Sequence, residues 1–107
     1  MSAPSLLAVA GAALALALPV AAAAGAVESA VRAAGAADAA ALAAADAESG
    51  WVEADPCELA STVAAAVDTT LESCEPDAAS GQVRISLSVQ TMFGRVTARA
   101  RAGPEVA

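Results

Sequence analysis

Cysteine is the residue type with the clearest chemistry in this sequence, which contains two, Cys57 and Cys74. Their spacing is not the Cys-x-x-Cys of redox enzymes, and two thiols without any histidine make a poor zinc site. A disulfide closing a loop of about this size stabilises a fold by ~3 kcal/mol in the chain-entropy treatment. We predict a structural disulfide between Cys57 and Cys74. The alternative is two buried thiols that only pack.

Two pairs of carboxylates are the other candidates for chemistry, Glu53 with Asp55 and Glu75 with Asp77. Such pairs can transfer protons or hold a divalent cation. However, no glycine-punctuated ligand loop surrounds them, no phosphate-binding glycine loop occurs, and no histidine is present to activate a serine or threonine. We therefore expect solvated acidic loops, no metal or cofactor, no small-molecule substrate and no enzymatic activity.

The charged residues are unevenly distributed along the 107-residue chain, whose net charge is −7. Most acidic residues lie between Asp38 and Asp77, whereas four of the five arginines lie between Arg84 and Arg101. An acidic chain lacks the broad basic surface that neutralises phosphates, so we expect no nucleic-acid partner. We interpret the arginine cluster as the solvent-exposed face of a strand that balances the acidic middle.

The elements that must position these residues begin with an uncharged apolar stretch from Ser5 to Val27. At ~1.5 Å rise per residue it spans roughly 34 Å, enough for a hydrocarbon core of ~30 Å. We predict that residues 1–27 form a single transmembrane helix, kinked at Pro19, in the cell membrane, with the C-terminal head outside the cytoplasm. The alternative is a cleaved secretory signal, because small residues such as "AAAAGA" suit a cleavage site, although "MSAPS" lacks the usual basic residue.

An alanine-rich segment, residues 28–50, is expected to continue this helix up to a C-cap at Ser49 and Gly50. Glu28 and Arg32 form a favourable i,i+4 pair. We expect Arg32, Asp38 and Asp46 to point to solvent, with Leu42 on the opposite, alanine-lined side.

That alanine-lined side has almost no relief, because five alanines recur at helical spacing: Ala37, Ala40, Ala41, Ala44 and Ala45. Each alanine buries little apolar area, so such a face would gain little free energy from burial in the core of its own chain. Small side chains do allow close approach of another helix. We therefore predict a helix-packing interface that binds a helix of another subunit.

Residues 51–107 are expected to form a small disulfide-stapled α+β head. The run "DPCE" predicts a helix start, with Asp55 as N-cap, Pro56 at the first helical position and the helix ending near Asp68. We expect a short strand over residues 69–73, a turn over residues 75–81, and Trp51 as an anchor of the linker against the head. Two period-2 runs, "VRISLSV" and "RVTARARA", flank Gly94 and predict an antiparallel hairpin.

The predicted fold class is therefore α+β and pilin-like: a long N-terminal helix, a short second helix and a small antiparallel sheet of about three strands. The segments would be the transmembrane helix over residues 1–27, its alanine-rich continuation over residues 28–50, and the head over residues 51–107.

The order of these features resembles the TadE/TadG-like family of the tight-adherence (Flp) pilus. The similarity covers residues 6–104 and lies in "AADAAALAAA" after the apolar helix, Cys57, "LESC" with Cys74, an alternating strand and the ending "TARARAGP". It is strongest to an actinobacterial TadE-like subgroup encoded beside helicase and secretion genes. The resemblance implies a minor pilin-like component or accessory of a type IVb pilus or related secretion apparatus, with other membrane proteins of that apparatus as partners.

Prepilin processing is not expected from the sequence. Substrates of a prepilin peptidase carry a glycine followed five residues later by a glutamate, but here Gly11 is followed by Leu16 and Gly25 by Ala30. Two functional alternatives also stay open. One is a small secreted binding protein released by signal cleavage, and the other is a membrane-tethered regulator whose acidic loop captures a basic partner.

Overall fold

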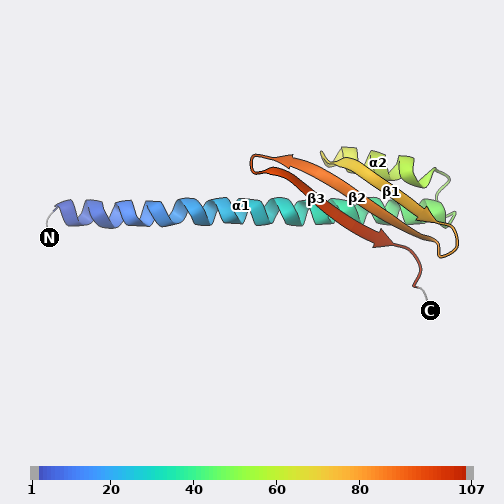
Figure 1. The fold of residues 1–107 in the computed structure, drawn as a ribbon, viewed down its shortest axis with the longest axis horizontal. Coiled ribbons are helices and arrows are strands. Elements are labelled where there is room, and N and C mark those ends of the chain that lie inside the picture. The colour runs from blue at the N-terminus through green and yellow to red at the C-terminus, as the bar shows by residue number, and fades with distance from the viewer. Residues whose placement is uncertain (1–2, 106–107) are drawn as a thin grey trace.

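The computed structural model describes residues 3–105 and has the predicted α+β fold (Figure 1). Residues 1, 2, 106 and 107, which belong to the predicted N-terminal and C-terminal segments, lie outside the described residues. The elements are two helices followed by three strands: α1 Ala3–Glu48, α2 Pro56–Ala66, β1 Thr70–Asp77, β2 Gln82–Thr91 and β3 Gly94–Ala102.

Helix α1 dominates the shape of the molecule, because its 46 residues extend far beyond the head (Figure 1). The long dimension of the molecule is 73 Å, close to the length of about 69 Å that α1 has at about 1.5 Å per residue. The helix continues through Pro19, and its ribbon shows no sharp bend, so the predicted kink is not seen. It ends as predicted, since Gly50 takes a left-handed φ of +84° just beyond Glu48.

Helix α2 begins with the predicted cap. The Asp55 carboxylate accepts hydrogen bonds from the backbone N–H groups of Cys57 and Glu58, both at 3.0 Å, and Pro56 occupies the first turn. At the other end the Thr69 hydroxyl donates to the Ala64 carbonyl oxygen at 2.8 Å. Both ends of this short helix therefore have their exposed backbone groups partly satisfied.

The sheet is antiparallel with the order β1-β2-β3, and β2 and β3 form the predicted hairpin. Its register pairs Val89 with Val96 and Thr91 with Gly94, which leaves two residues at the tip. Strand β1 runs to Asp77, further than predicted, because it is an edge strand, where the missing N–H of a proline is tolerated. The turn is therefore shorter than residues 75–81.

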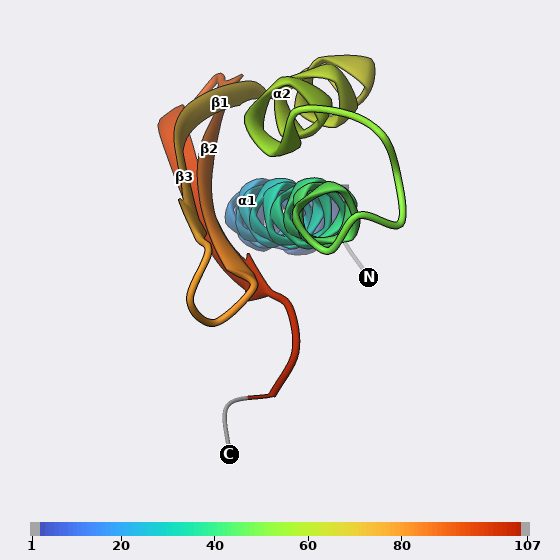
Figure 2. The same ribbon diagram turned by 90° about the vertical axis from the view of Figure 1, so that its right-hand side faces the viewer.

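The core lies between α1 and the elements that wrap around it. Figure 2 shows α1 in the concave side of the curved sheet, with α2 packed beside it. The largest fully buried side chains come from alternate positions of β2, namely Val83, Ile85 and Leu87. Ala98, Ala100 and Ala102 of β3 pack against the same core, so small side chains let the sheet approach α1 closely.

Candidate functional site

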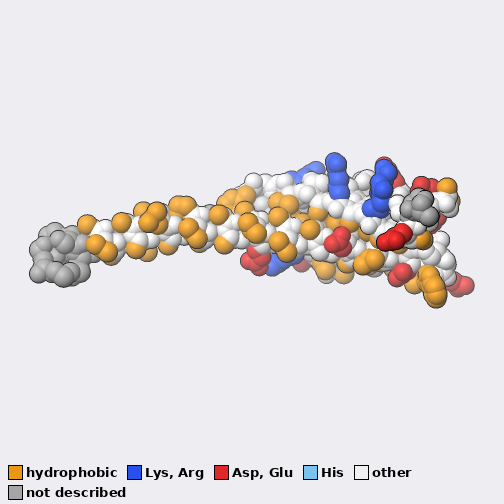
Figure 3. All heavy atoms as spheres, turned by 90° about the horizontal axis from the view of Figure 1, so that it is seen from below, with side chains coloured by type: hydrophobic (Ala, Val, Ile, Leu, Met, Phe, Trp, Pro, Cys, Tyr) orange, Lys and Arg blue, Asp and Glu red, His pale blue; other side chains and the backbone are white. Residues whose placement is uncertain are grey.

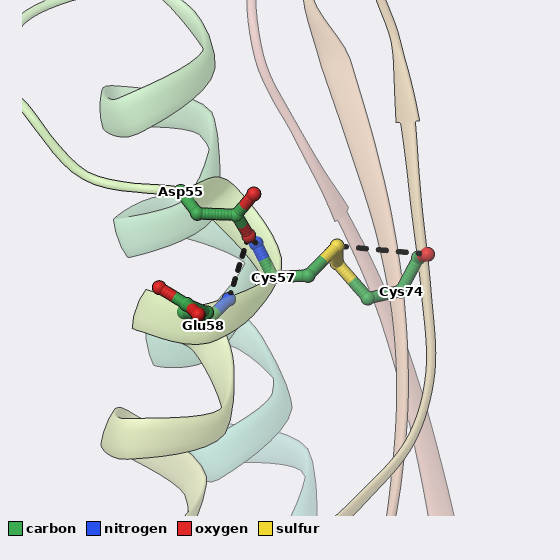
Figure 4. The surroundings of a disulfide bond; sticks show 4 residues. All are labelled: Asp55, Cys57, Glu58 and Cys74. Carbon is green, nitrogen blue, oxygen red and sulfur yellow. Dashed lines mark hydrogen bonds between the residues drawn. A yellow bond between two sulfur atoms is a disulfide. The ribbon is translucent and has the colours of Figure 1, made fainter.

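Cys57 and Cys74 form the predicted disulfide (Figure 4). Their sulfur atoms are 2.12 Å apart and their Cα atoms 5.8 Å apart, across 17 positions of sequence. Cys57 lies in the first turn of α2, and Cys74 lies in the edge strand β1. The Cys57 Sγ also lies 3.7 Å from the Cys74 carbonyl oxygen, a contact rather than a donated bond because a disulfide sulfur carries no hydrogen.

The position of the disulfide indicates a structural role. Cys74 is half-buried and packs against the core that contains Ala40, Ala44 and Ile85. The bond therefore ties α2 to the edge strand directly above the part of the core that α1 supplies. It constrains α2 and β1, neither of which contributes a fully buried large side chain to the core.

The predicted carboxylate pairs are not assembled into a site. Asp55 is occupied as the cap of α2, whereas Glu53 is an exposed loop residue. The Asp77 carboxylate accepts a hydrogen bond from the Ala79 N–H at 3.0 Å at the start of the β1–β2 turn. Among the residues that the structure describes, no group of three or more histidine, cysteine, aspartate or glutamate side chains could hold a metal ion.

Local hydrogen bonding changes the acidity of Asp77. The Ser80 hydroxyl and then the Ala79 N–H lower its pKa from the ordinary value of 3.8 by hydrogen bonding to the ionised form. Because the pKa is lower in the folded protein, the ionised carboxylate stabilises the turn at any pH above the pKa of the unfolded chain. This contribution is lost as the pH falls through the folded pKa. The effect is confined to this turn, where the Asp77 side chain is exposed.

The arginine cluster lies on the solvent-facing side of the sheet, as predicted. All four of its members are exposed: Arg84, Arg95, Arg99 and Arg101. Arg84 pairs in register with Glu75 of β1, and the Arg95 guanidinium lies 3.8 Å from the Glu72 carboxylate. These partners belong to the acidic middle of the chain, so the strand face balances that charge within the head.

The five alanines of the predicted helix-packing interface are buried inside the head. Their exposed fractions are 0% for Ala37, Ala40, Ala41 and Ala44 and 6% for Ala45. All of them except Ala45, together with Ala33 and Ala36, form the α1 side of two core clusters, whose other members come from α2 and the sheet. The prediction that another subunit docks on this face is therefore corrected, because the protein's own head covers it.

The alanine face can be part of the protein's own core because other elements supply the large side chains that it lacks. Ala60 and Ala64 of α2 let the two helices approach closely, while Ile85 and Leu87 of β2 supply the volume that the alanines lack. Asp38 and Asp46 are exposed, as expected. Leu42 was expected beside the alanines but is 60% exposed on the other side of α1. Trp51 is 85% exposed, so it does not anchor the linker.

The N-terminal half of α1 has a different environment. One helix in the described part of the chain is long and apolar enough that it could cross a membrane, and its most apolar stretch is not buried in the molecule. The exposed large side chains there are Val9, Leu14, Leu16, Leu18 and Val20. Figure 3 shows this half covered by hydrophobic side chains, with the charged side chains gathered over the head. The first charges, Glu28 and Arg32, form an exposed ion pair at 3.1 Å.

The tip of the β2–β3 hairpin was missed by the sequence analysis. Met92 is 91% exposed and Phe93 is 59% exposed. Phe93 is the only phenylalanine in the chain. A signal was available, because two bulky apolar residues stand immediately before the turn glycine Gly94, where polar residues are usual.

The C-terminal motif "TARARAGP" has a structural explanation. Gly103 has a φ of +141°, and a Cβ there would lie 2.7 Å from both the Gln82 Cα and the Gly81 carbonyl oxygen. The Gln82 side-chain amide donates to the Pro104 carbonyl oxygen at 3.0 Å. The glycine thus lets the C-terminal segment pass close to the β1–β2 turn.

Comparisons of the chain with protein-family models, with curated proteins and with solved structures find no match. The resemblance to TadE-like proteins therefore stays a prediction from the sequence. The features that the structure provides are an exposed apolar half-helix, a head folded on the other half, and a disulfide.

Proposed function

We propose that the protein is a non-enzymatic, membrane-anchored TadE-like accessory or minor pilin-like component of a type IVb (Flp/Tad) pilus or a related secretion apparatus. The observation that supports it is the division of α1. One half is uncharged and exposed, and the other half is the spine of a small disulfide-stapled head.

The anchor follows from the cost of exposing apolar side chains to water. Burying a large aliphatic side chain is worth about 1.5–3 kcal/mol, and five such side chains of the projecting half are 67–72% exposed. A bilayer removes this cost, and an α-helix satisfies its own backbone hydrogen bonds there. Lipid is thus the surrounding that best suits residues 8–27.

The disulfide supports the proposed side of the membrane. Disulfides persist in oxidising compartments outside the cytoplasm, so the head that contains Cys57 and Cys74 is proposed to be extracytoplasmic. The small head also has little other means of stabilisation, because many of its buried residues are alanines.

Contacts with partner subunits are proposed to involve the projecting half of α1. The alanine face from Ala37 to Ala45 is already covered, whereas Gly11 and the alanines around it are exposed between larger apolar side chains. Small residues of this kind let helices pack closely within a bilayer. The identity of the apparatus rests on the sequence resemblance.

The anchor is tested by washing native membranes with alkaline carbonate and measuring the intact mass of the protein that stays behind. We expect retention, with a mass that includes the apolar segment and two cysteines that alkylate only after reduction. A soluble form beginning near Val27 would contradict the anchor.

The apparatus is tested by placing a photo-crosslinking amino acid at Leu14 in the projecting half, with Leu42 in the head as the matched exposed position. We expect irradiation to join the Leu14 variant to pilus or secretion membrane proteins, identified by mass spectrometry after detergent extraction. Equal adducts from both positions, or adducts with abundant unrelated membrane proteins alone, would contradict the proposal.

A second candidate function is a small secreted binding protein. The observation that favours it is the position of the buried residues of α1, all of which lie at Ala33 or beyond among the described side chains. Cleavage after the small residues before Val27 would therefore leave the head's core intact. The intact mass of the mature protein separates the two functions.

A further inference from the structure

The β2–β3 hairpin tip carries apolar bulk that the core does not use. In a chain with one phenylalanine and two methionines, Phe93 and Met92 are both placed at an exposed turn. Exposed apolar residues that stand together at a tip indicate a contact surface. The tip is here defined as Thr91–Gly94.

The tip lies beside α1 at the point where the helix leaves the head. A shallow groove of about 380 Å³ is lined by Gly25, Ser29 and Ala33 of α1 and by Met92 and Phe93 of the tip. The hairpin points toward the N-terminal half of α1 in Figure 1. The two bulky residues are therefore level with residues 25–33, at the end of the uncharged stretch.

The surrounding charges fit a membrane–water boundary at this level. Glu28 and Arg32 are the first charges after the apolar stretch, and Arg32 lines the same groove as the tip. Arg95 follows the tip in β3 and is exposed. A helix that starts its span near Ser5 uses about 20 residues to cross the hydrocarbon core, which places Gly25 and Ser29 in the interfacial layer.

We propose that Met92 and Phe93 insert into the interfacial layer of the bilayer that α1 spans, so that the head contacts the membrane at two places. This inference rests on the proposed membrane anchor. The partner is a lipid surface because the tip is continuous with the apolar surface of the projecting helix. Apolar side chains flanked by arginines are typical of segments that bind at this depth, where anionic headgroups lie close by.

The two contacts would fix the orientation of the head. Helix α1 alone allows the head to rotate about the membrane normal and to tilt, whereas an inserted tip selects the tilt that brings β2 and β3 toward the bilayer. The far end of the head, with Trp51 and the β1–β2 turn, would then point away from the membrane, since it lies at the opposite end of the packed part of α1 (Figure 1).

The test uses fluorescence of the full-length protein in vesicles of phosphatidylcholine and phosphatidylglycerol in equal parts. A Phe93→Trp substitution in a Trp51→Phe background places the only indole at the tip, and the unsubstituted protein, with its indole at Trp51, is the control. Lipids brominated close to the headgroup quench an indole only when it lies in the interface. Flotation and carbonate washing of the same vesicles report whether α1 is inserted.

We expect the tip indole to be blue-shifted and to lose most of its emission to the brominated lipid, while Trp51 is unaffected. Insertion of α1 with an unquenched, water-like tip indole would overturn the inference and leave the anchor standing. A blue-shifted but unquenched indole would indicate a protein contact, such as a second copy of the chain, and would also overturn it. Failure of flotation would instead overturn the anchor on which the inference rests.

A second variant guards against an effect of the indole itself. Met92→Ser together with Phe93→Ser removes the apolar tip without changing the strands, and Trp51→Ser is the matched change of an exposed large residue at the far end. We expect only the tip variant to increase protease cleavage at Arg95 in vesicles. Equal cleavage of both variants would contradict tip insertion.

Discussion

The two halves of α1 have similar alanine-rich sequences and opposite surroundings. From Ala8 to Arg32 no described side chain is fully buried, whereas seven alanines between Ala33 and Ala45 are buried by the sheet and α2. What differs is the side that faces outward. In the projecting half it carries leucine and valine, and in the packed half it carries Asp38 and Asp46.

The comparison shows that alanine content does not reveal what covers a helix. The same low-relief surface suits a neighbouring helix in lipid and a neighbouring sheet in water, because small side chains allow close approach in both. The residues on the exposed side of the helix decide whether water or lipid can surround it. Charges there require water, and their absence over residues 8–27 permits lipid.

The largest effect on the packed half is expected from Leu87→Ala. Leu87 is 0% exposed and supplies volume against Ala33, Ala36 and Ala37. Truncation leaves a cavity, so we expect the head to lose about 2–5 kcal/mol of stability. Hydrogen exchange of the β2 amides in detergent-solubilised full-length protein measures this loss, and membrane retention should not change. Unaltered exchange would show that the alanine face is not packed by the sheet.

The next effect concerns the disulfide. Replacing Cys57 and Cys74 together by alanine removes a crosslink across 17 positions and should destabilise the head by about 3 kcal/mol. Exchange of β1 amides should rise most, because β1 is the edge strand that the bond holds. Equal protection of oxidised and cysteine-free protein would contradict a structural role.

A smaller effect is expected from Ala41→Leu. Ala41 is 0% exposed and sits in the core with Ala60 and Ile85, so extra methylenes overpack it and cost about 1–3 kcal/mol. The exposed Asp38→Ala is the matched control and should change stability by no more than about 0.5 kcal/mol. If Ala41→Leu left the head as stable as the control but weakened association with partner subunits, the face would be an interface after all.

Several elements were predictable because their signals are local. Asp55 and Pro56 define the start of α2 through their own hydrogen bonds and ring geometry, and Gly50 ends α1. The alternation of Val83, Ile85 and Leu87 predicted which face of β2 is buried. In each case the relevant interaction is with near neighbours in sequence, or follows from the period of the strand.

These signals could not predict what packs against the alanine face. Helical spacing fixes that Ala37 and Ala41 share a side with Ala44, but it does not say whether the partner lies in the same chain. The position of Leu42, by contrast, was readable: it stands four residues after Asp38 and four before Asp46, so it shares their exposed side of the helix. Phe93 was missed because the turn was identified through Gly94 without asking what the exposed neighbours contact.

The central claim is that the projecting half of α1 lies in lipid and the packed half in water. The most direct test of it compares Leu16→Asp with Leu42→Asp. Both leucines are exposed on α1, at 72% and 60%, in the projecting and the packed half respectively. A charge at the centre of a span costs about 2.5–3.5 kcal/mol of insertion, so carbonate should release the Leu16→Asp protein from membranes while the Leu42→Asp protein stays. Retention of both variants, or release of both, would contradict the account.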